Sequence, residues 1–210
     1  MKKVLLVLLM ACLFVTGCDS DNENPTGSIV EERNSGSSAL EQKETTSVSA
    51  ETIKLGETKE IKSTYDDEEI EVTIKLDDMY ISSVVNPPEP KQSYYTYYPE
   101  YDGKTYLVVV LDVKNLGGKK LNTDYVFTNF LGDNCKTTVK ADGKYEYTSS
   151  TVVGLEKDSN GKFDFDSYYY MEPLEQNKLY VLYQIPTEVK DKPMNVNVCL
   201  GDKKVNLVKE

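Results

Sequence analysis

Apolar and polar residues alternate along much of the chain from about residue 51 onward. Between Ile70 and Leu76 every second residue is apolar, and Glu71, Thr73 and Lys75 separate them. A period of two indicates a strand with one buried face. Residues 106–113 are apolar except for Asp112, which predicts a central strand.

The same pattern predicts a series of short strands separated by turns. Asp142-Gly143 and Asn160-Gly161 lie between alternating runs, where such pairs favour tight hairpins. No stretch of this domain shows a sustained 3.6-residue period. We expect further strands at residues 79–85, 124–131, 136–141, 145–153, 163–171, 178–185, 194–200 and 204–208. These strands predict one all-β domain, a sandwich or barrel, over residues 51–210.

The first residues have the composition of a secretory signal. Lys2 and Lys3 precede a run without charge from position 4 to position 15. A membrane-spanning helix needs about 20 apolar residues. We therefore expect a signal peptide at residues 1–17 rather than a permanent span.

Val15-Thr16-Gly17-Cys18 ends this run and resembles the bacterial lipobox, in which two small residues precede a diacylated cysteine. The resemblance implies cleavage before Cys18 and a lipid on its sulfur. Each buried methylene contributes about 0.8 kcal/mol, so two or three acyl chains anchor a protein stably. The expected location is the extracytoplasmic side of the cell membrane.

The segment that follows Cys18 is mostly polar and contains no aromatic residue up to residue 50. Such a segment cannot bury enough apolar surface to offset the entropy lost on ordering. We expect residues 18–50 to form a disordered tether between the lipid and the domain.

The charge of the chain excludes one class of partner. Loss of Lys2 and Lys3 leaves 22 of the 24 basic residues against 35 acidic ones, a net charge of about −13. Nucleic-acid binding depends on basic side chains that neutralise phosphates, and anionic lipid attracts basic segments. We expect no nucleic-acid partner and a domain that stays off the bilayer.

Two cysteines remain after removal of Cys12 and lipidation of Cys18. Cys135 and Cys199 form an even pair, which in an exported domain permits a disulfide. Cys199 shares its strand face with Asn197 rather than with the apolar residues. A bridge would therefore lie on an outer face or edge, not between two sheets.

The chain contains no histidine. This excludes catalytic triads based on histidine and zinc sites with histidine ligands. Neither a P-loop nor a Gly-rich dinucleotide turn is present in the sequence. We expect a non-catalytic protein without a cofactor; a carboxylate-dependent enzyme acting on glycans stays open as an alternative.

Three segments carry a family resemblance. Leu55-Gly56-Glu57 precedes the alternating strand, residues 106–115 form an apolar run that ends in Asn and a Gly-containing turn, and residues 179–186 end in proline. Together they resemble bacterial lipoproteins with the Domain of Unknown Function 4352. The resemblance implies a telokin-like, immunoglobulin-like antiparallel β-sandwich outside the cytoplasm, and no catalytic residues. The chain departs from the family at residues 175–177, where Pro-Gly is usual, and at residues 85–101, which resemble an insertion.

Five tyrosines follow the proline-rich residues 87–90. Tyrosine supplies a large contact area at low entropy cost, together with a hydroxyl group. We expect this segment to bind a protein or a glycan; the alternative is a long hairpin whose tyrosines pack on the flank of the sandwich. The five are Tyr94, Tyr95, Tyr97, Tyr98 and Tyr101. For the second tyrosine group, Tyr168-Tyr169-Tyr170, alternation predicts one or two side chains in the core.

Two acidic runs are candidates for metal binding. Asp158, Asn160 and Asp164 fall at ligand positions of an EF-hand loop. That loop, however, begins with glutamate, ends with serine in place of a bidentate glutamate, and has no predicted flanking helices. A type I′ turn explains Asn160-Gly161 equally well, so we expect no metal. For the second run, residues 66–69, we expect a solvated turn.

These patterns predict a membrane-anchored, non-catalytic lipoprotein. Its domain would bind an unidentified protein or glycan of the cell envelope through the tyrosines of residues 94–101. The second hypothesis is a structural or assembly lipoprotein whose domain pairs with the edge strand of a neighbour.

Overall fold

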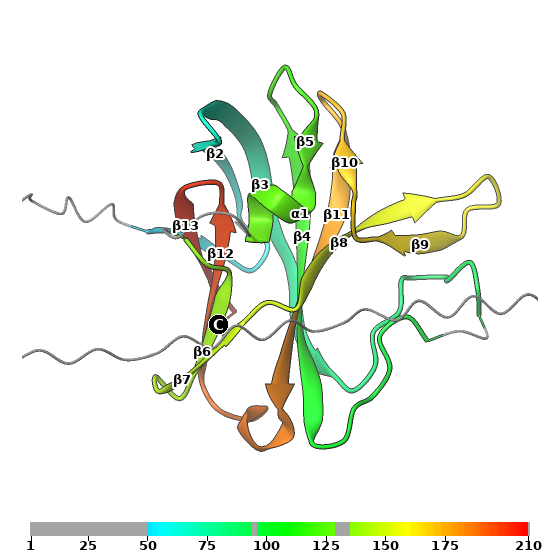
Figure 1. Cartoon of the computed structure of the whole chain (residues 1–210), viewed down its shortest axis with the longest axis vertical. Helices are drawn as coiled ribbons and strands as arrows, with labels where there is room; N and C mark the ends of the chain where they lie inside the picture. Colours follow the sequence, from blue (N-terminus) through cyan, green and yellow to red (C-terminus); the bar gives the residue numbers. More distant parts are fainter. Residues whose placement is uncertain (1–49, 94–95, 129–134, 210) are drawn as a thin grey trace, which may run out of the picture. The chain divides into compact units, whose positions relative to one another are not determined.

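Two β-sheets pack face to face in the part of the chain that the computed structural model describes, residues 50–93, 96–128 and 135–209 (Figure 1). The all-β sandwich predicted from the sequence is therefore confirmed. The predicted signal peptide, the lipidation site Cys18 and the tether up to residue 49 lie outside the described residues. No helix within the described ranges has the length and apolar character needed to cross a membrane.

The smaller sheet has five strands. In spatial order they are β1 (Glu51–Lys54), β13 (Lys203–Val208), β12 (Met194–Leu200), β6 (Thr138–Ala141) and β7 (Tyr145–Thr148). β1 pairs with β13 in parallel, and the other strands of this sheet pair antiparallel, as predicted. The Asp142-Gly143 pair has positive φ angles of 55° and 62° and joins β6 to β7, as its sequence predicts.

The larger sheet has six strands. In spatial order they are β2 (Thr58–Tyr65), β3 (Glu68–Ser82), β4 (Lys104–Asn115), β11 (Gln176–Pro186), β8 (Thr151–Lys157) and β9 (Phe163–Asp166). The most apolar strand, β4, is central and pairs with β3 and β11 along nearly its whole length.

Short elements complete the domain. β5 (Leu121–Asn122) pairs with β10 (Tyr170–Met171), helix α1 (Thr123–Thr128) follows β5, and a 3₁₀ helix (Thr187–Val189) follows β11. A strand was predicted at residues 124–131, and this was wrong for residues 124–128. The side chain of Asn122 accepts the N–H of Tyr125 at 3.3 Å and caps the helix. Val126 and Phe127 are consecutive and both buried, a pattern that one helical turn permits and a half-buried strand does not.

Two predicted strands, residues 70–76 and 79–85, are largely one strand. The pairing of β3 with β4 shifts between Leu76 and Asp78, which marks a β-bulge at Asp77. The extra residue allows both Leu76 and Met79 to face the core. Conversely, the predicted strand at residues 145–153 is two strands, because the chain leaves the smaller sheet after β7 and enters the larger sheet at β8.

The main core lies between the two sheets. Side chains from every second position of β3, β4 and β11 meet those of β12 and β13, and Leu111, Val181 and Val198 are completely buried. Full burial of one such side chain contributes about 1.5–3 kcal/mol.

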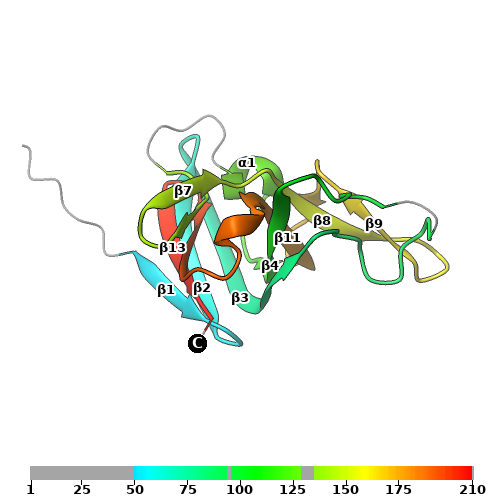
Figure 2. The same cartoon turned by 90° about the horizontal axis from the view of Figure 1, so that it is seen from below.

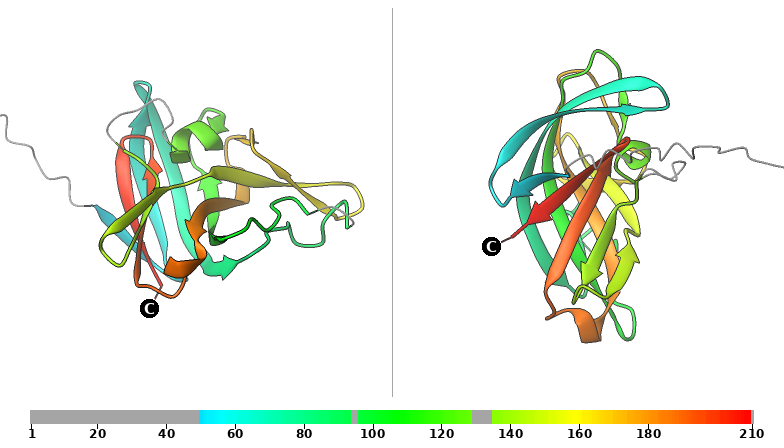
Figure 3. Two further views of the ribbon diagram at one scale, coloured as in Figure 1. Left: turned by 60° about the horizontal axis from the view of Figure 1, so that its bottom comes forward. Right: turned by 90° about the vertical axis from the view of Figure 1, so that its left-hand side faces the viewer.

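A second apolar cluster lies on the outer face of the larger sheet. It contains Val108, Val153 and Leu182, all fully buried. The described parts of residues 83–103 and the β8–β9 hairpin lie side by side there and extend away from the smaller sheet (Figures 2 and 3). We call these two segments the wing. The central strands are thus covered on both faces, which explains their continuous apolar sequences.

Cys135 and Cys199 form a disulfide, with Cα atoms 5.8 Å apart. Cys199 lies on the face of β12 that it shares with Asn197, opposite the core residues Val196 and Val198. The bridge is therefore on the outer side of the smaller sheet. Both cysteines are nevertheless buried, and the N–H of Cys199 donates to Thr137 Oγ1 at 2.8 Å.

Candidate functional site

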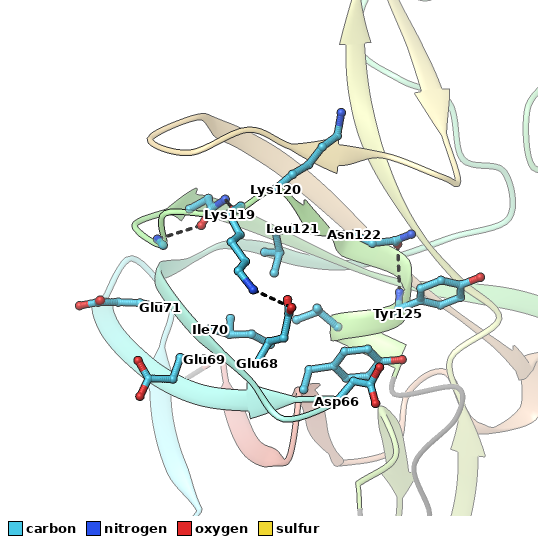
Figure 4. Close-up of a pocket in the computed structure, with 14 residues that line it drawn as sticks. Asp66, Glu68, Glu69, Ile70, Glu71, Lys119, Lys120, Leu121, Asn122 and Tyr125 are labelled. Atoms are coloured by element: carbon cyan, nitrogen blue, oxygen red, sulfur yellow. Dashed lines mark hydrogen bonds and ion pairs between the residues drawn. The ribbon is translucent and has the colours of Figure 1, made fainter.

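A groove of about 310 Å³ lies at the upper end of the sandwich in Figure 1, between the β2–β3 turn and the loop that joins β4 to β5 (Figure 4). We call it the end groove. Its floor is apolar, because the buried side chains of Ile70, Leu121 and Val126 come together there from β3, β5 and α1.

Asn115 holds the β4–β5 loop in place. Its side chain is buried and donates to the carbonyl of Lys119 at 2.8 Å and to that of Met171 at 3.2 Å. Its side-chain oxygen accepts the N–H of Gly117 at 2.9 Å. A single residue at the end of β4 therefore fixes one wall of the end groove against β10.

The rim of the end groove is charged. Lys119 forms an ion pair with Glu68 at 2.6 Å, and this pair joins the two walls (Figure 4). Both side chains are more than half exposed, and exposed pairs contribute only about 0–1 kcal/mol. A partner could therefore separate them at small cost. The lining contains four carboxylates and two lysines: Asp66, Glu68, Glu69, Glu71, Lys119 and Lys120.

Tyr65 and Tyr125 add aromatic surface to the groove lining. Burial raises the pKa of Tyr65, and the neighbouring carboxylate of Asp66 raises it further. Burial also raises the pKa of Asp124, in the first turn of α1.

Exposed apolar side chains surround the end groove on the α1 and β10 side. Tyr170 is paired with Asn122, and Lys120 lies 5.1 Å from the centre of the Tyr170 ring. Leu174 donates its N–H to the carbonyl of Asn115. We call the end groove together with these side chains the end surface. The exposed members are Tyr125 (40%), Tyr168 (68%), Tyr170 (47%) and Leu174 (68%).

Alternation places only the middle tyrosine of residues 168–170 against the core. Tyr169 packs on the core cluster beside Gly154, and its hydroxyl donates to Glu175. The strand predicted at residues 163–171 is interrupted after β9, because Asp166 accepts the N–H of Tyr168 at 2.8 Å and closes a turn. Tyr168 and Tyr170 therefore point away from the core.

Of the tyrosines predicted as a binding loop, Tyr97, Tyr98 and Tyr101 lie in the wing. The rings of Tyr97 and Tyr98 contact the ring of Phe165, with centroids 5.6 Å and 5.9 Å away. Tyr98 also packs against the second apolar cluster. The rings of Tyr97 and Tyr98 thus pack on the flank of the sandwich, as in the alternative to a binding loop. Tyr101 is 51% exposed, and Tyr94 and Tyr95 lie outside the described residues.

The candidate calcium ligands make hydrogen bonds within the β8–β9 hairpin. Asp158 accepts the N–H groups of Asn160 and Lys162 at 2.8 and 2.9 Å, which lowers its pKa. Asp164 accepts the N–H of Phe165 at 2.9 Å. Over the described ranges, no three His, Cys, Asp or Glu side chains lie close enough together to hold a metal ion.

Comparison with known proteins gives a fold and no activity. No protein-family model and no curated protein matches the chain. A solved structure does match: an uncharacterized beta-sandwich protein from Clostridium difficile 630. The chain resembles it in fold. The two are 23% identical, the match covers 75% of this chain and 93% of the other, and the TM-score is 0.55. The likeness to the Domain of Unknown Function 4352 lipoproteins therefore remains a resemblance.

Proposed function

We propose that this protein is an exported, non-catalytic lipoprotein, anchored to the cell membrane through Cys18, whose β-sandwich binds a protein partner through the end surface. The observation that carries the binding role is that exposed Tyr125 lines a preformed groove, while exposed Tyr168 and Tyr170 lie on the neighbouring segment that bonds to β5 and the start of α1. Aromatic side chains provide most of the binding energy in many protein interfaces. Large exposed apolar patches commonly mark such interfaces.

The disulfide supports export. Disulfides form in oxidising compartments and are rare in the cytosol of most cells. The Cys135–Cys199 bridge joins segments 64 residues apart within the domain. It agrees with the signal peptide and lipobox inferred from the first 18 residues.

The charge of the end groove indicates the kind of partner. Carboxylates outnumber lysines in the lining by four to two, and Lys120 is bound to Glu172 at 2.8 Å. A facing surface that carries basic groups beside apolar ones complements this lining. Electrostatic complementarity of this kind increases association rate and specificity.

Assembly by strand pairing has less support. Edge strands β1 and β7 have four residues each. Edge strand β9 is bonded to the other segment of the wing, since Lys91 donates its N–H to the carbonyl of Phe163. In edge strand β2, the carbonyl of Thr64 accepts the N–H of Asp202.

Cross-linking in the parent cell tests the binding role. The full chain and its Tyr125→Ala/Tyr168→Ala/Tyr170→Ala variant are cross-linked at the cell surface and purified. We expect a defined protein adduct with the wild-type chain and at least a tenfold loss of that adduct with the variant, at unchanged thermal stability. The same adduct at the same yield in both would overturn the proposal.

Tyr145 offers a matched control at the other end of the sandwich. It is 43% exposed in β7 and has Lys144 at 4.9 Å from its ring centre, compared with 47% and 5.1 Å for Tyr170. Tyr145→Ala removes a similar exposed ring with a similar cation contact. We expect the adduct to form with this variant as with the wild type.

A further inference from the structure

A second groove lies between the wing and the outer face of the larger sheet. It encloses about 720 Å³, within the usual range of small-ligand sites. It shares no lining residue with the end groove. We call it the outer groove, and its function is independent of the partner proposed for the end surface.

The wing forms one wall of the outer groove, and backbone hydrogen bonds hold that wall in place. Phe163 donates its N–H to the carbonyl of Glu89 at 3.1 Å and accepts the N–H of Lys91 at 2.8 Å. Glu89 also forms an ion pair with Lys162 at 3.3 Å. Pro88 therefore lies on a segment that bonds to β9, and Phe163 lies in β9 itself; both line the groove.

The floor of the outer groove is a row of polar side chains across the two central strands. Asp112 in β4 and Lys178 in β11 are paired residues of the sheet, and Gln176 follows on the same face. The next row, Val110 and Tyr180, is buried in the second apolar cluster. The outer face of the larger sheet therefore changes from apolar to polar at the edge of the area that the wing covers.

Hydrogen bonds orient this row before any ligand arrives. The side-chain amide of Gln176 donates to both carboxylate oxygens of Asp112, at 2.9 and 3.0 Å. Lys178 and Lys75 both bind the carboxylate of Asp77, and these contacts lower the pKa of Asp77. Preorganised side chains lose little entropy on binding.

We propose that the outer groove binds a neutral oligosaccharide. The lining contains one carboxylate, Asp112, and one ammonium group, Lys178, so its formal charges cancel. Phe163, which is only partly buried, supplies aromatic surface against which the C–H face of a sugar ring packs. Asp112 and Gln176 supply planar groups that bond pairs of adjacent hydroxyls.

Charged ligands fit this groove less well. An anionic ligand would meet the carboxylate of Asp112, and a cationic one would meet the ammonium group of Lys178. A neutral ligand rich in hydroxyl groups matches both the donors and the acceptors present.

A glycan array followed by calorimetry tests this proposal. The full chain in detergent is screened against neutral saccharides, acidic saccharides and unmodified peptides, and the dissociation constant of the best neutral saccharide is then measured. We expect binding to neutral saccharides and at least a tenfold loss of affinity in Asp112→Ala and in Gln176→Ala. Both residues are on the surface of the sheet, so near-wild-type melting temperatures are expected.

Gln184→Ala is the matched control. Gln184 lies in the same strand, β11, and bonds a neighbour in β4, Lys104, at 3.1 Å, but it is outside the outer groove. We expect its affinity to stay within twofold of the wild type. Binding to acidic saccharides or peptides alone, binding to no array component, or equal binding by Asp112→Ala would each overturn the proposal. The Tyr125→Ala/Tyr168→Ala/Tyr170→Ala variant should bind the saccharide like the wild type. The two proposals can therefore be tested, and can fail, independently.

Discussion

Tyr183 links the two sheets through a buried hydroxyl. Its side chain is completely enclosed in the core, and its hydroxyl donates to the carbonyl of Asn197 in β12 at 3.0 Å. A buried polar group that lacks its hydrogen bond costs free energy, so this contact specifies how β11 and β12 face each other.

The Tyr183→Phe variant removes this hydroxyl and little else. We expect the free energy of unfolding to fall by about 1 kcal/mol, because the folded domain loses one buried-hydroxyl hydrogen bond. Urea denaturation measures the change, with Tyr145→Phe as an exposed control. Equal stability of Tyr183→Phe and the wild type would show that the bond contributes nothing.

Buried tyrosines also make the free energy of unfolding depend on pH in the alkaline range. Burial raises the pKa of Tyr183, and burial with the Glu175 hydrogen bond raises that of Tyr169 to about 12, whereas an unfolded tyrosine has a pKa of about 10. Above pH 10 the unfolded chain loses tyrosine protons that the folded domain keeps. The contribution of these tyrosines to the free energy of unfolding is therefore fully present below about pH 10 and is lost as the pH rises through 12. Denaturation at pH 8 to 12 should show this decline, with a shallower slope in Tyr183→Phe. An unchanged slope in that variant would contradict the assignment.

Single residues of the end surface were only partly predictable from sequence. Alternation identifies one core residue among residues 168–170, and Tyr169 is that residue. It does not reveal that Asp166 closes a turn, which leaves Tyr168 and Tyr170 exposed. An aspartate two residues before Tyr168 was the local signal for this turn.

Elements with long apolar patterns were the most predictable. The sequence identified β4 and β11 because strands covered on both faces are apolar throughout. It could not identify α1, since a helix of six residues is too short to display a 3.6-residue period. The bulge at Asp77 was also hidden, because one extra residue reads as a break between two strands.

Two tyrosines of the wing distinguish the two roles considered for residues 94–101, packing on the sandwich or binding a partner. Tyr98 contacts Phe165 and Tyr106 and packs on the outer apolar cluster, whereas Tyr101 is 51% exposed. We expect Tyr98→Ala to lower the free energy of unfolding by about 2 kcal/mol and Tyr101→Ala to leave it nearly unchanged. Thermal melting of both variants measures this. If Tyr98→Ala melted like the wild type, the segment would be free to act as the binding loop that the sequence suggested.

The end groove could not be predicted as a site, because its lining comes from separate parts of the sequence. Residues 65–71, 115–122 and 125–126 meet only after β3, β4 and α1 have packed. The sequence predicted a turn at residues 66–69; Asp66 and Asp67 form the turn between β2 and β3, whereas Glu68 and Glu69 are the first residues of β3.

The disulfide stabilises the whole domain rather than one element. It closes a loop of 64 residues that includes parts of both sheets. We expect reduction of the bridge to lower the free energy of unfolding by about 2–4 kcal/mol, since the crosslink restricts the unfolded chain. Urea denaturation with and without dithiothreitol measures this effect, and the Cys135→Ala/Cys199→Ala variant should be insensitive to the reductant. Equal free energies of unfolding for the wild type with and without dithiothreitol would show that the bridge does not stabilise the domain.

The proposed location outside the cytoplasm would connect these features of the whole molecule. Disulfides such as Cys135–Cys199 form mainly in oxidising compartments, and the net charge of about −13 expected after loss of Lys2 and Lys3 would keep the domain away from anionic lipid. A lipid at Cys18 would then hold the domain at the membrane while leaving its surfaces accessible to partners.

Mass spectrometry of the amino-terminal peptide tests the central claim most directly. The chain is purified from the membrane fraction of its parent cell, and the same measurement is made on Cys18→Ala. We expect a wild-type chain that begins at Cys18 and carries the mass of a diacylglyceryl group, and a variant that is neither acylated nor cleaved there. An intact, unmodified Met1 terminus on wild-type chain recovered from the cytosol would contradict it.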